Sequence, residues 1–171
     1  MKGIWLIGIA VPILLLGVAS VILLPRKLIY NPSESAPVGF YWIDQKPVRR
    51  GDFVVVRVPL SLRDLVETRG YLPPDVPLLK RVMALPGDEV CRRGQDITVN
   101  GGAVAMAQTR DRSGRDMPRW HGCQMLDGED IFVLQDHPQS FDGRYFGPLN
   151  RCLIIGRARL LRFPRRNDGK W

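Results

Sequence analysis

Two serines in one short segment are the residues of this chain best suited to covalent chemistry on a carbonyl group. Ser33 and Ser35 lie two positions apart in the segment 31–42, which reads NPSESAPVGFYW. Pro32 and Pro37 restrict the backbone around them, because a proline ring fixes φ. A serine hydroxyl needs a neighbouring base or a similar activating group before it attacks a carbonyl. The search for chemistry therefore turns to the base.

Histidine is a poor candidate for that base. The chain has two histidines, His121 and His137, and no Gly-x-Ser-x-Gly elbow, so a Ser-His-Asp hydrolase is poorly supported. A zinc site is equally poorly supported, because His121, Cys91 and Cys123 match no standard ligand spacing. We expect no metal ion and no cofactor.

Lys80 is a better candidate for the base. Leu78, Lys80 and Val82 alternate along a predicted strand and therefore share one face, whereas Arg81 points to the other. An amine between apolar side chains loses hydration, which lowers its pKa from about 10.4 toward the range where a neutral amine acts as a base. Arginine does not deprotonate in proteins. The alternative is an edge-strand lysine whose stem lies along apolar surface.

A third polar segment follows a predicted strand. Residues 134–150 read LQDHPQSFDGRYFGPLN and contain Ser140, Asp142 and Arg144 in a loop bounded by glycine and proline. Asp142 and Arg144 are placed to form an ion pair that fixes the loop, and Ser140 is able to hydrogen-bond a nearby amine. The alternative is an ordinary charged turn.

The elements that must position these groups are mainly β-strands. The chain has 17 glycines and 14 prolines, which favour a turn-rich β fold over a helical bundle. A short helix that ends at Gly70 is expected within 60–76, which we interpret as an insertion. Strands are predicted at 51–59, 77–88, 96–105 (a hairpin around Asn100-Gly101), 129–136 and 152–163. The predicted fold class is mostly β, with an antiparallel domain.

A long apolar run precedes this domain. Residues 4–24 carry no charge, and at about 1.5 Å per residue a helix of this length crosses a hydrocarbon core of about 30 Å. The sequence therefore predicts a single transmembrane helix in an N-terminal anchor, residues 1–27, followed by a domain at 28–171. The alternative is a cleaved signal peptide. Basic residues on both sides of the run leave its orientation open.

The chain is basic, with a formal net charge of +8. Anionic membrane lipid next to an anchored domain would attract this charge, and the aromatic residues 40–42 suit either a membrane interface or a protein core. No nucleic-acid partner is expected, because no recognition motif accompanies the basic residues. The alternative is a solvated basic surface. The basic residues cluster in the segment 110–119 and in the tail, at Arg157, Arg159, Arg162, Arg165, Arg166 and Lys170.

Three segments, taken in order, resemble the boxes of a known family. SESAP (33–37), LLKRVMALPGDEV (78–90) and QDHPQSFDGRYFGPL (135–149) are similar to those of the type I signal peptidases of the S26 superfamily, which are membrane-anchored Ser-Lys proteases. The variant resembles the TraF-type conjugal-transfer peptidases, which mature pilin precursors. One departure from the housekeeping enzymes is the Ser-Ala-Pro order after Ser35, where those enzymes usually have Ser-Met-x-Pro. The resemblance covers residues 31–160.

The resemblance implies a role for each matching residue. Ser35 is the expected nucleophile and Lys80 its general base. Ser33 matches the hydroxyl of the oxyanion hole, although Ser33 as the nucleophile remains an alternative. Ser140 matches the serine that orients the lysine. Asp142 and Arg144 match a structural pair, in which the aspartate has also been considered catalytic in the conjugal branch.

The resemblance also implies a location that charge does not settle. The protein would cross the bacterial inner membrane once and hold its peptidase domain in the periplasm, a compartment that permits disulfides. Cys91 follows a Pro-Gly-Asp turn and Cys123 precedes the strand near Glu129, so we predict a Cys91–Cys123 bridge with Cys152 unpaired. Other pairings stay open at this level.

The function expected from this resemblance is that of a membrane-bound serine endopeptidase. It would process an exported precursor protein, with a conjugative pilin for type IV secretion as the first candidate and cyclisation as a further option. One alternative is a general signal peptidase that removes secretory leaders. Another is a non-catalytic envelope component of a secretion channel, which would tolerate the loss of Ser35 and Lys80.

Overall fold

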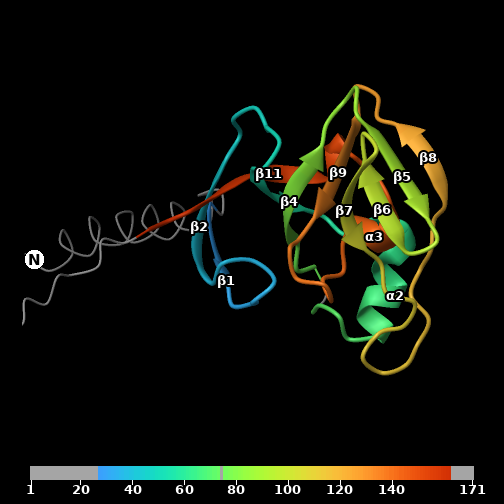
Figure 1. Cartoon of the computed structure of the whole chain (residues 1–171). Coiled ribbons are helices and arrows are strands. Elements are labelled where there is room, and N and C mark those ends of the chain that lie inside the picture. Colours follow the sequence, from blue (N-terminus) through green and yellow to red (C-terminus); the bar gives the residue numbers. More distant parts are fainter. Residues whose placement is uncertain (1–26, 74, 163–171) are drawn as a thin grey trace, which may run out of the picture.

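The computed structural model of the chain describes residues 27–73 and 75–162 (Figure 1). The anchor predicted at 1–27 falls outside these residues, apart from Lys27. None of the helices in the described ranges has the length and apolar character needed to cross a membrane. The predicted antiparallel, mostly β domain is confirmed.

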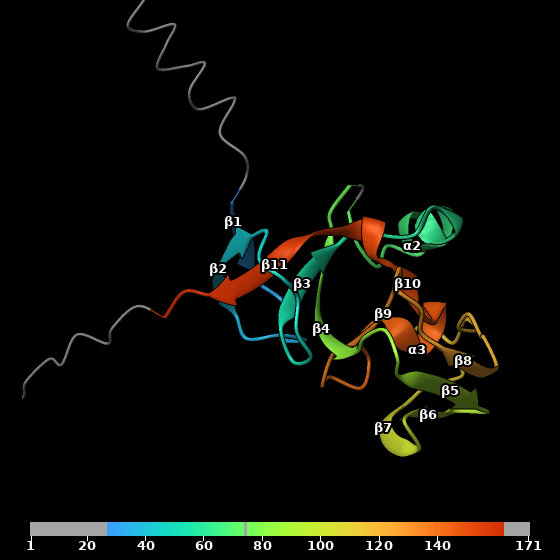
Figure 2. The same ribbon diagram turned by 90° about the horizontal axis from the view of Figure 1, so that it is seen from above.

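Seven antiparallel strands form the larger of two sheets. Its order places the hairpin β1–β2 at one end and β4 further along, with β11 and β3 between β2 and β4 (Figure 2). The segments that carry the serines and the lysine therefore belong to one sheet. Across this sheet the strands are β1 (Leu28–Asn31), β2 (Gly39–Asp44), β11 (Ile154–Leu160), β3 (Phe53–Val56), β4 (Leu78–Ala84), β9 (Asp130–Leu134) and β10 (Leu149–Asn150).

Four further antiparallel strands form a smaller sheet at the opposite end of the molecule from β1 and β2, as both views show. Asn100 and Gly101 join β6 to β7 with φ values of 49° and 78°, the left-handed conformation of a two-residue hairpin turn. The predicted hairpin is confirmed. In order, the strands are β7 (Gly102–Met106), β6 (Asp96–Val99), β5 (Glu89–Arg93) and β8 (Gly122–Met125).

The helices are short. The predicted insertion contains η1 (Leu60–Leu62) and α2 (Arg63–Thr68), and Gly70 follows with a φ of 65°, so the predicted helix is confirmed. The other two helical segments are α3 (Gly143–Phe146) and η2 (Arg151–Leu153). α3 begins directly after Asp142, so the third polar segment runs from β9 into this helix.

Two of the four apolar clusters in the described residues pack the strands nearest the site. One is centred on valines of β3, β4 and β9, including Val54, Val82 and Val133. The other packs Phe132 of β9 against Val90 of β5 and so joins the two sheets. Burying each such side chain contributes about 1.5–3 kcal/mol. The site described below is therefore built on packed strands.

Each strand predicted from the sequence contains an observed strand, but several observed strands were not predicted. No strand was predicted in the serine-bearing segment 31–42, which includes the end of β1 and most of β2. Along β2 the aromatic residues alternate: Tyr41 is buried, whereas Phe40 and Trp42 are exposed. Tyr41 is therefore a core residue, whereas Phe40 and Trp42 lie on the exposed face of the strand, where the expectation of a membrane interface applies.

Candidate active site

A buried asparagine shapes the loop that carries the two serines. Asn31, the last residue of β1, accepts the Ser33 backbone N–H at 3.1 Å through its side-chain oxygen. Its amide nitrogen donates to the carbonyl oxygens of Ser33, Ala36 and Pro37, at 2.9, 3.1 and 3.2 Å. The Tyr41 hydroxyl also donates to the Pro37 carbonyl, at 2.8 Å. One side chain thus fixes most of the turn.

The two serines contact each other within this loop. Their hydroxyl oxygens are 2.8 Å apart, and the Ser35 backbone N–H donates to the Ser33 hydroxyl at 3.2 Å. Ser33 is exposed and Ser35 is half-buried. The Ser33 hydroxyl that the resemblance assigns to an oxyanion hole therefore lies beside the backbone N–H of Ser35.

Lys80 lies on the face of β4 that the alternation predicted. Its side chain is only 4% exposed, and its neighbours Leu78 and Val82 on the same face are also buried. The amine donates to the Ser140 hydroxyl at 2.6 Å. Burial lowers the pKa of Lys80 to about 8, although the nearby Asp142 carboxylate opposes this shift. The prediction of a desolvated lysine is confirmed.

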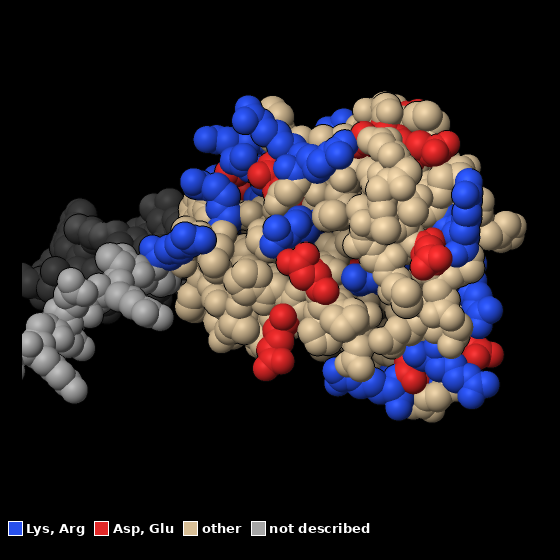
Figure 3. Space-filling model, in the orientation of Figure 1, with Lys and Arg blue, Asp and Glu red and all other residues tan. Residues whose placement is uncertain are grey.

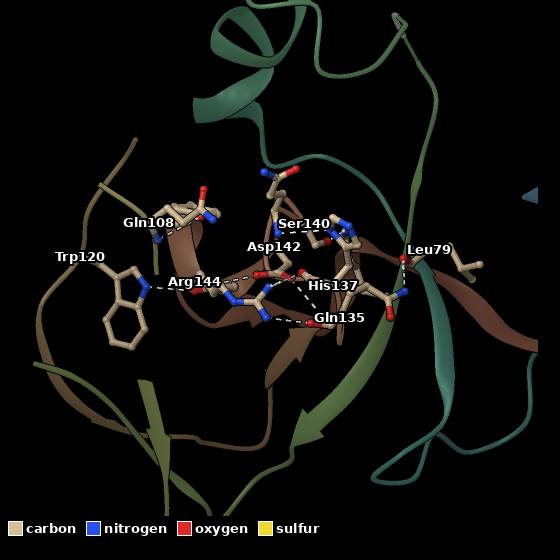
Figure 4. A network of polar contacts seen from close by, with 12 residues as sticks. Leu79, Gln108, Trp120, Gln135, His137, Ser140, Asp142 and Arg144 are labelled. Atoms are coloured by element: carbon tan, nitrogen blue, oxygen red, sulfur yellow. Dashed lines mark hydrogen bonds and ion pairs between the residues drawn. The ribbon is translucent and has the colours of Figure 1, made fainter. Parts of the chain in front are cut away.

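The loop after β9 is held by a buried ion pair between Asp142 and Arg144. The Arg144 Nη1 is 2.6 Å from one Asp142 oxygen, and the backbone N–H groups of Gln135 and Arg144 donate to the carboxylate at 3.0 and 3.1 Å. Arg144 Nη2 donates to the Gln135 carbonyl at 2.8 Å. Burial raises the pKa of Asp142 against these donors. Figure 4 shows this network, with Ser140 beside it.

Two residues that the sequence did not suggest support this network from the side of the smaller sheet. Arg92 of β5 is buried and donates to the Arg144 carbonyl, and the Trp120 indole N–H donates to the Gly143 carbonyl at 2.9 Å. Gly143 has no room for a side chain, because a Cβ atom there would lie 2.6 Å from the Phe132 ring. No local sequence signal reveals Arg92 or Trp120, since both bind backbone carbonyls of a distant segment.

These elements surround a cleft of about 590 Å³. Ser33, Ser35, Lys80 and Ser140 line it, together with residues that follow α2 and the segment 108–117. Asp142 is fully buried and is not part of the lining. Within the described part of the chain no hydrogen bond joins Ser35 to Lys80. The expected nucleophile and base share one cleft. Ser35 is hydrogen-bonded to Ser33, and Lys80 is hydrogen-bonded to Ser140.

The arrangement has the chemical parts that acyl transfer requires. A lysine with a pKa of about 8 is partly neutral at physiological pH, so its amine is able to accept a proton. Two hydroxyl groups and a backbone N–H lie in the same cleft and are suited to attack a carbonyl and to bind the oxygen that becomes charged.

The cysteines lie outside this cleft. The predicted Cys91–Cys123 disulfide is present and joins β5 to β8, whereas Cys152 is free and exposed. Glu89 lies close to both bonded sulfurs. Sulfur atoms in a disulfide are not the thiolates that bind zinc. Among Glu89, Cys91 and Cys123, only the Glu89 carboxylate is therefore able to bind a metal ion.

Comparison with known proteins gives consistent matches along the chain. The family described as "Signal peptidase, peptidase S26" matches residues 1–163. A plasmid transfer protein TraF of Escherichia coli is 37% identical over 73% of this chain and 77% of its own length. A conjugal transfer protein TraF of Agrobacterium fabrum is 31% identical over 75% of this chain and 78% of its own. A signal peptidase I of Leptolyngbya laminosa is 30% identical over 92% and 77%.

The family match covers all the residues that the structure describes, including the serine, lysine and Asp-x-Arg segments. Signal peptidases of this family are peptidases of the serine type, which agrees with the serines and the buried lysine of the cleft. The chain therefore belongs to the peptidase S26 family of signal peptidases, among its TraF-type conjugal transfer proteins.

Proposed function

We propose that this protein is a membrane-anchored serine endopeptidase in which Ser35 is the nucleophile and Lys80 is its general base. One observation carries the proposal: a buried amine with a pKa of about 8 lines the same cleft as Ser35. A lysine exposed to water would be almost fully protonated near neutral pH and unable to act as a base. Burial in β4 provides the neutral form.

The reaction follows from these two groups. Neutral Lys80 accepts the Ser35 hydroxyl proton while the oxygen attacks the carbonyl carbon of the substrate's peptide bond. When the tetrahedral intermediate collapses, the lysine ammonium returns that proton to the leaving amine, and an ester joins the substrate to Ser35. Water, deprotonated by the same lysine, then attacks the ester carbon. The ester bond to Ser35 breaks, the lysine ammonium returns the proton to the Ser35 oxygen, and the acid product leaves. An amine in place of water would instead form a new peptide bond.

The neighbouring residues support each step. Without substrate the Ser33 and Ser35 hydroxyls bond to each other. A bound carbonyl would replace that contact, so that the Ser33 hydroxyl and the Ser35 N–H donate to the developing oxyanion. Loss of such a donor typically costs about 2.7–4 kcal/mol of transition-state stabilisation. Ser140 orients Lys80 through its 2.6 Å hydrogen bond, and Asp142 with Arg144 holds the loop that carries Ser140.

The proposed substrate is an exported precursor protein, and a conjugative pilin is the first candidate. Relatives from Escherichia coli and Agrobacterium fabrum are named for plasmid and conjugal transfer, and the resemblance to TraF-type peptidases implies a pilin precursor as the substrate. The enzyme would remove a leader or a tail from it. If the pilin's own α-amino group attacks the ester that joins its new C-terminal end to Ser35, the pilin becomes cyclic.

The proposed location is the inner membrane, with the domain in the periplasm and lipid as a partner. Besides the apolar run at 4–24, one face of the β1–β2 hairpin supports membrane contact. Leu28 lies opposite Trp42 and Tyr30 opposite Phe40, and these four side chains are 39–56% exposed. Arg159 of the adjacent β11 lies opposite Trp42. An aromatic face beside basic groups suits an anionic lipid interface.

The direct test is the mass of the candidate pilin precursor in cells that carry the wild type, Ser35→Ala or Lys80→Ala. Each variant is first shown to reach the membrane fraction at the wild-type level. We expect mature pilin with the wild type and unprocessed precursor with both variants. A product lighter by one water than the linear cleaved chain would indicate cyclisation. Unchanged processing by both variants, and by Ser33→Ala in the same assay, would leave the non-catalytic envelope role standing.

A general signal peptidase is the second candidate, favoured by the match with the Leptolyngbya laminosa enzyme over 92% of this chain. The same cells distinguish the two functions if the masses of unrelated secreted proteins are followed. A dedicated pilin peptidase leaves their leaders in place when the host signal peptidase is depleted. A general enzyme removes them under those conditions.

A further inference from the structure

The lining of the cleft carries more arginine than acid. The Asp111 carboxylate forms an ion pair with Arg115, with 2.7 Å between Asp111 Oδ2 and Arg115 Nε. Arg69 and Arg112 make no ion pair with any described residue. Figure 3 shows basic side chains gathered over the lower edge of the molecule, where Figure 1 draws the loop below α2. The charged residues of the described lining, apart from Lys80, are Arg69, Arg110, Arg112, Arg115, Glu34 and Asp111.

Arg112 has the geometry of a site for a carboxylate. Its Nε donates to the Gln139 side-chain oxygen at 2.6 Å, which fixes the plane of the guanidinium. Its two terminal nitrogens have no hydrogen-bond partner among residues 27–73 and 75–162, and the side chain is exposed to the cleft. A guanidinium edge of this kind binds a carboxylate through two parallel N–H bonds.

The loop that carries Arg112 is already ordered. One Asp111 oxygen accepts the backbone N–H groups of Ser113 and Arg115, both at 2.9 Å. The other accepts the Tyr71 hydroxyl at 2.7 Å, which ties the loop to the segment after α2. A ligand group that binds a preformed loop loses less free energy to ordering than one that binds a mobile loop.

The position of Arg112 relates it to the proposed chemistry. Its partner Gln139 precedes Ser140, whose hydroxyl accepts the hydrogen bond from Lys80. The guanidinium is therefore near the lysine side of the cleft. Arg112 and Ser35 line the same cleft, so a group bound by Arg112 belongs to a residue near the cleaved bond of a peptide that lies along the cleft.

We propose that Arg112 forms a carboxylate-binding subsite of the cleft, so that the preferred substrate carries an acidic group a few residues from the cleaved bond. The group is either an Asp or Glu side chain or the C-terminal carboxylate of the precursor, since both have the same chemistry. This inference rests on the proposed peptidase function and adds the chemical class of substrate that the enzyme selects.

The test uses the full-length protein in detergent and short internally quenched peptides with alanine on both sides of the cleavable bond. The peptides differ only in having Glu or Gln at one flanking position, or a free or amidated C-terminus. We expect the wild type to cleave the acidic peptide with a kcat/KM about tenfold higher. Arg112→Gln should remove this preference. Arg112→Glu should reverse the charge preference, so that a further peptide with Lys at that position is cleaved better than the Glu peptide.

The matched control is Arg93→Gln, an exposed arginine of β5 that does not line the cleft and should retain the full preference. A preference that depends only on the free C-terminus identifies the terminal carboxylate as the ligand. Equal cleavage of all peptides by the wild type, or a preference that survives in Arg112→Gln, overturns the subsite and leaves the peptidase function standing. No cleavage of any peptide by the wild type contradicts both.

Discussion

The Lys80 amine lies 2.6 Å from the Ser140 hydroxyl, and this pair is set into the wall of the cleft that Ser35 lines. The lysine comes from the middle of the larger sheet and the serine from the loop before α3. The loop is fixed in turn by the buried Asp142–Arg144 pair. The position of the amine therefore depends on two separate parts of the chain.

The lowered pKa of Lys80 predicts the pH dependence of the reaction. The active form is the neutral amine, so the rate should rise about tenfold per pH unit up to a pH of about 8 and level off above it. The measurement is kcat/KM against pH with one cleaved peptide. Lys80→Arg should be inactive at every pH, because the guanidinium keeps its proton. A rate that does not change between pH 6 and 9 would count against Lys80 as the base.

Ser140→Ala should lower activity by acting on Lys80. Removing the hydroxyl leaves the amine without its hydrogen-bond partner, and we expect kcat to fall about 10–100-fold, within the contribution of a general base. The hydroxyl stabilises the ammonium, so its loss should also move the pH profile to lower pH. Ser61→Ala, at an exposed serine of η1, is the control. An unshifted profile would mean that Ser140 has only a structural role.

Asp142→Asn should destabilise the protein. It leaves the buried Arg144 without its counter-charge, and breaking one side of a buried pair costs about 3–5 kcal/mol in free energy of unfolding. Urea unfolding measures this difference. Asp116→Asn removes an exposed partner of Arg110 and should change the same free energy by at most about 1 kcal/mol. Equal effects of the two variants would contradict the role of the buried pair.

The Cys91–Cys123 disulfide should contribute to stability. The cysteines are 32 residues apart, and replacing both by alanine should lower the free energy of unfolding by about 2–4 kcal/mol. The wild type should also lose this amount in reductant, whereas the double variant should not respond. Cys152→Ala, at the exposed free cysteine, is the control for general effects of substitution. A wild type that is insensitive to reductant would contradict the prediction.

Local patterns predicted the parts of the fold that depend on near neighbours in sequence. The alternation Leu78, Lys80, Val82 placed the lysine on the buried face, because side chains of a strand alternate regardless of the rest of the fold. The Asn100-Gly101 turn was equally local. The strand β8 gave no such signal, since all four of its residues are exposed and show no alternation.

The remaining parts of the site depend on hydrogen bonds between side chains and the backbone, within the serine loop for Asn31 and between distant segments for Arg92 and Trp120. The four bonds of Asn31 to the serine loop, and those of Arg92 and Trp120 to α3, mostly involve backbone atoms. Such contacts leave no pattern in side-chain type or spacing. The strand β1 was missed for a different reason: it has only four residues and follows the predicted membrane run closely, with Pro25, Arg26 and Lys27 between them.

The central claim is that the Ser35 side chain reacts next to the Lys80 amine, and one measurement tests it without knowledge of the substrate. In a Cys152→Ala background, Ser35→Cys introduces the one free thiol, whose alkylation rate is followed against pH. A neighbouring ammonium stabilises the thiolate. The account predicts a thiol pKa well below about 8.5, returning to that value when Lys80→Ala is added. The same thiol pKa with and without Lys80, or a lysine-dependent shift only in Ser33→Cys, would contradict the account.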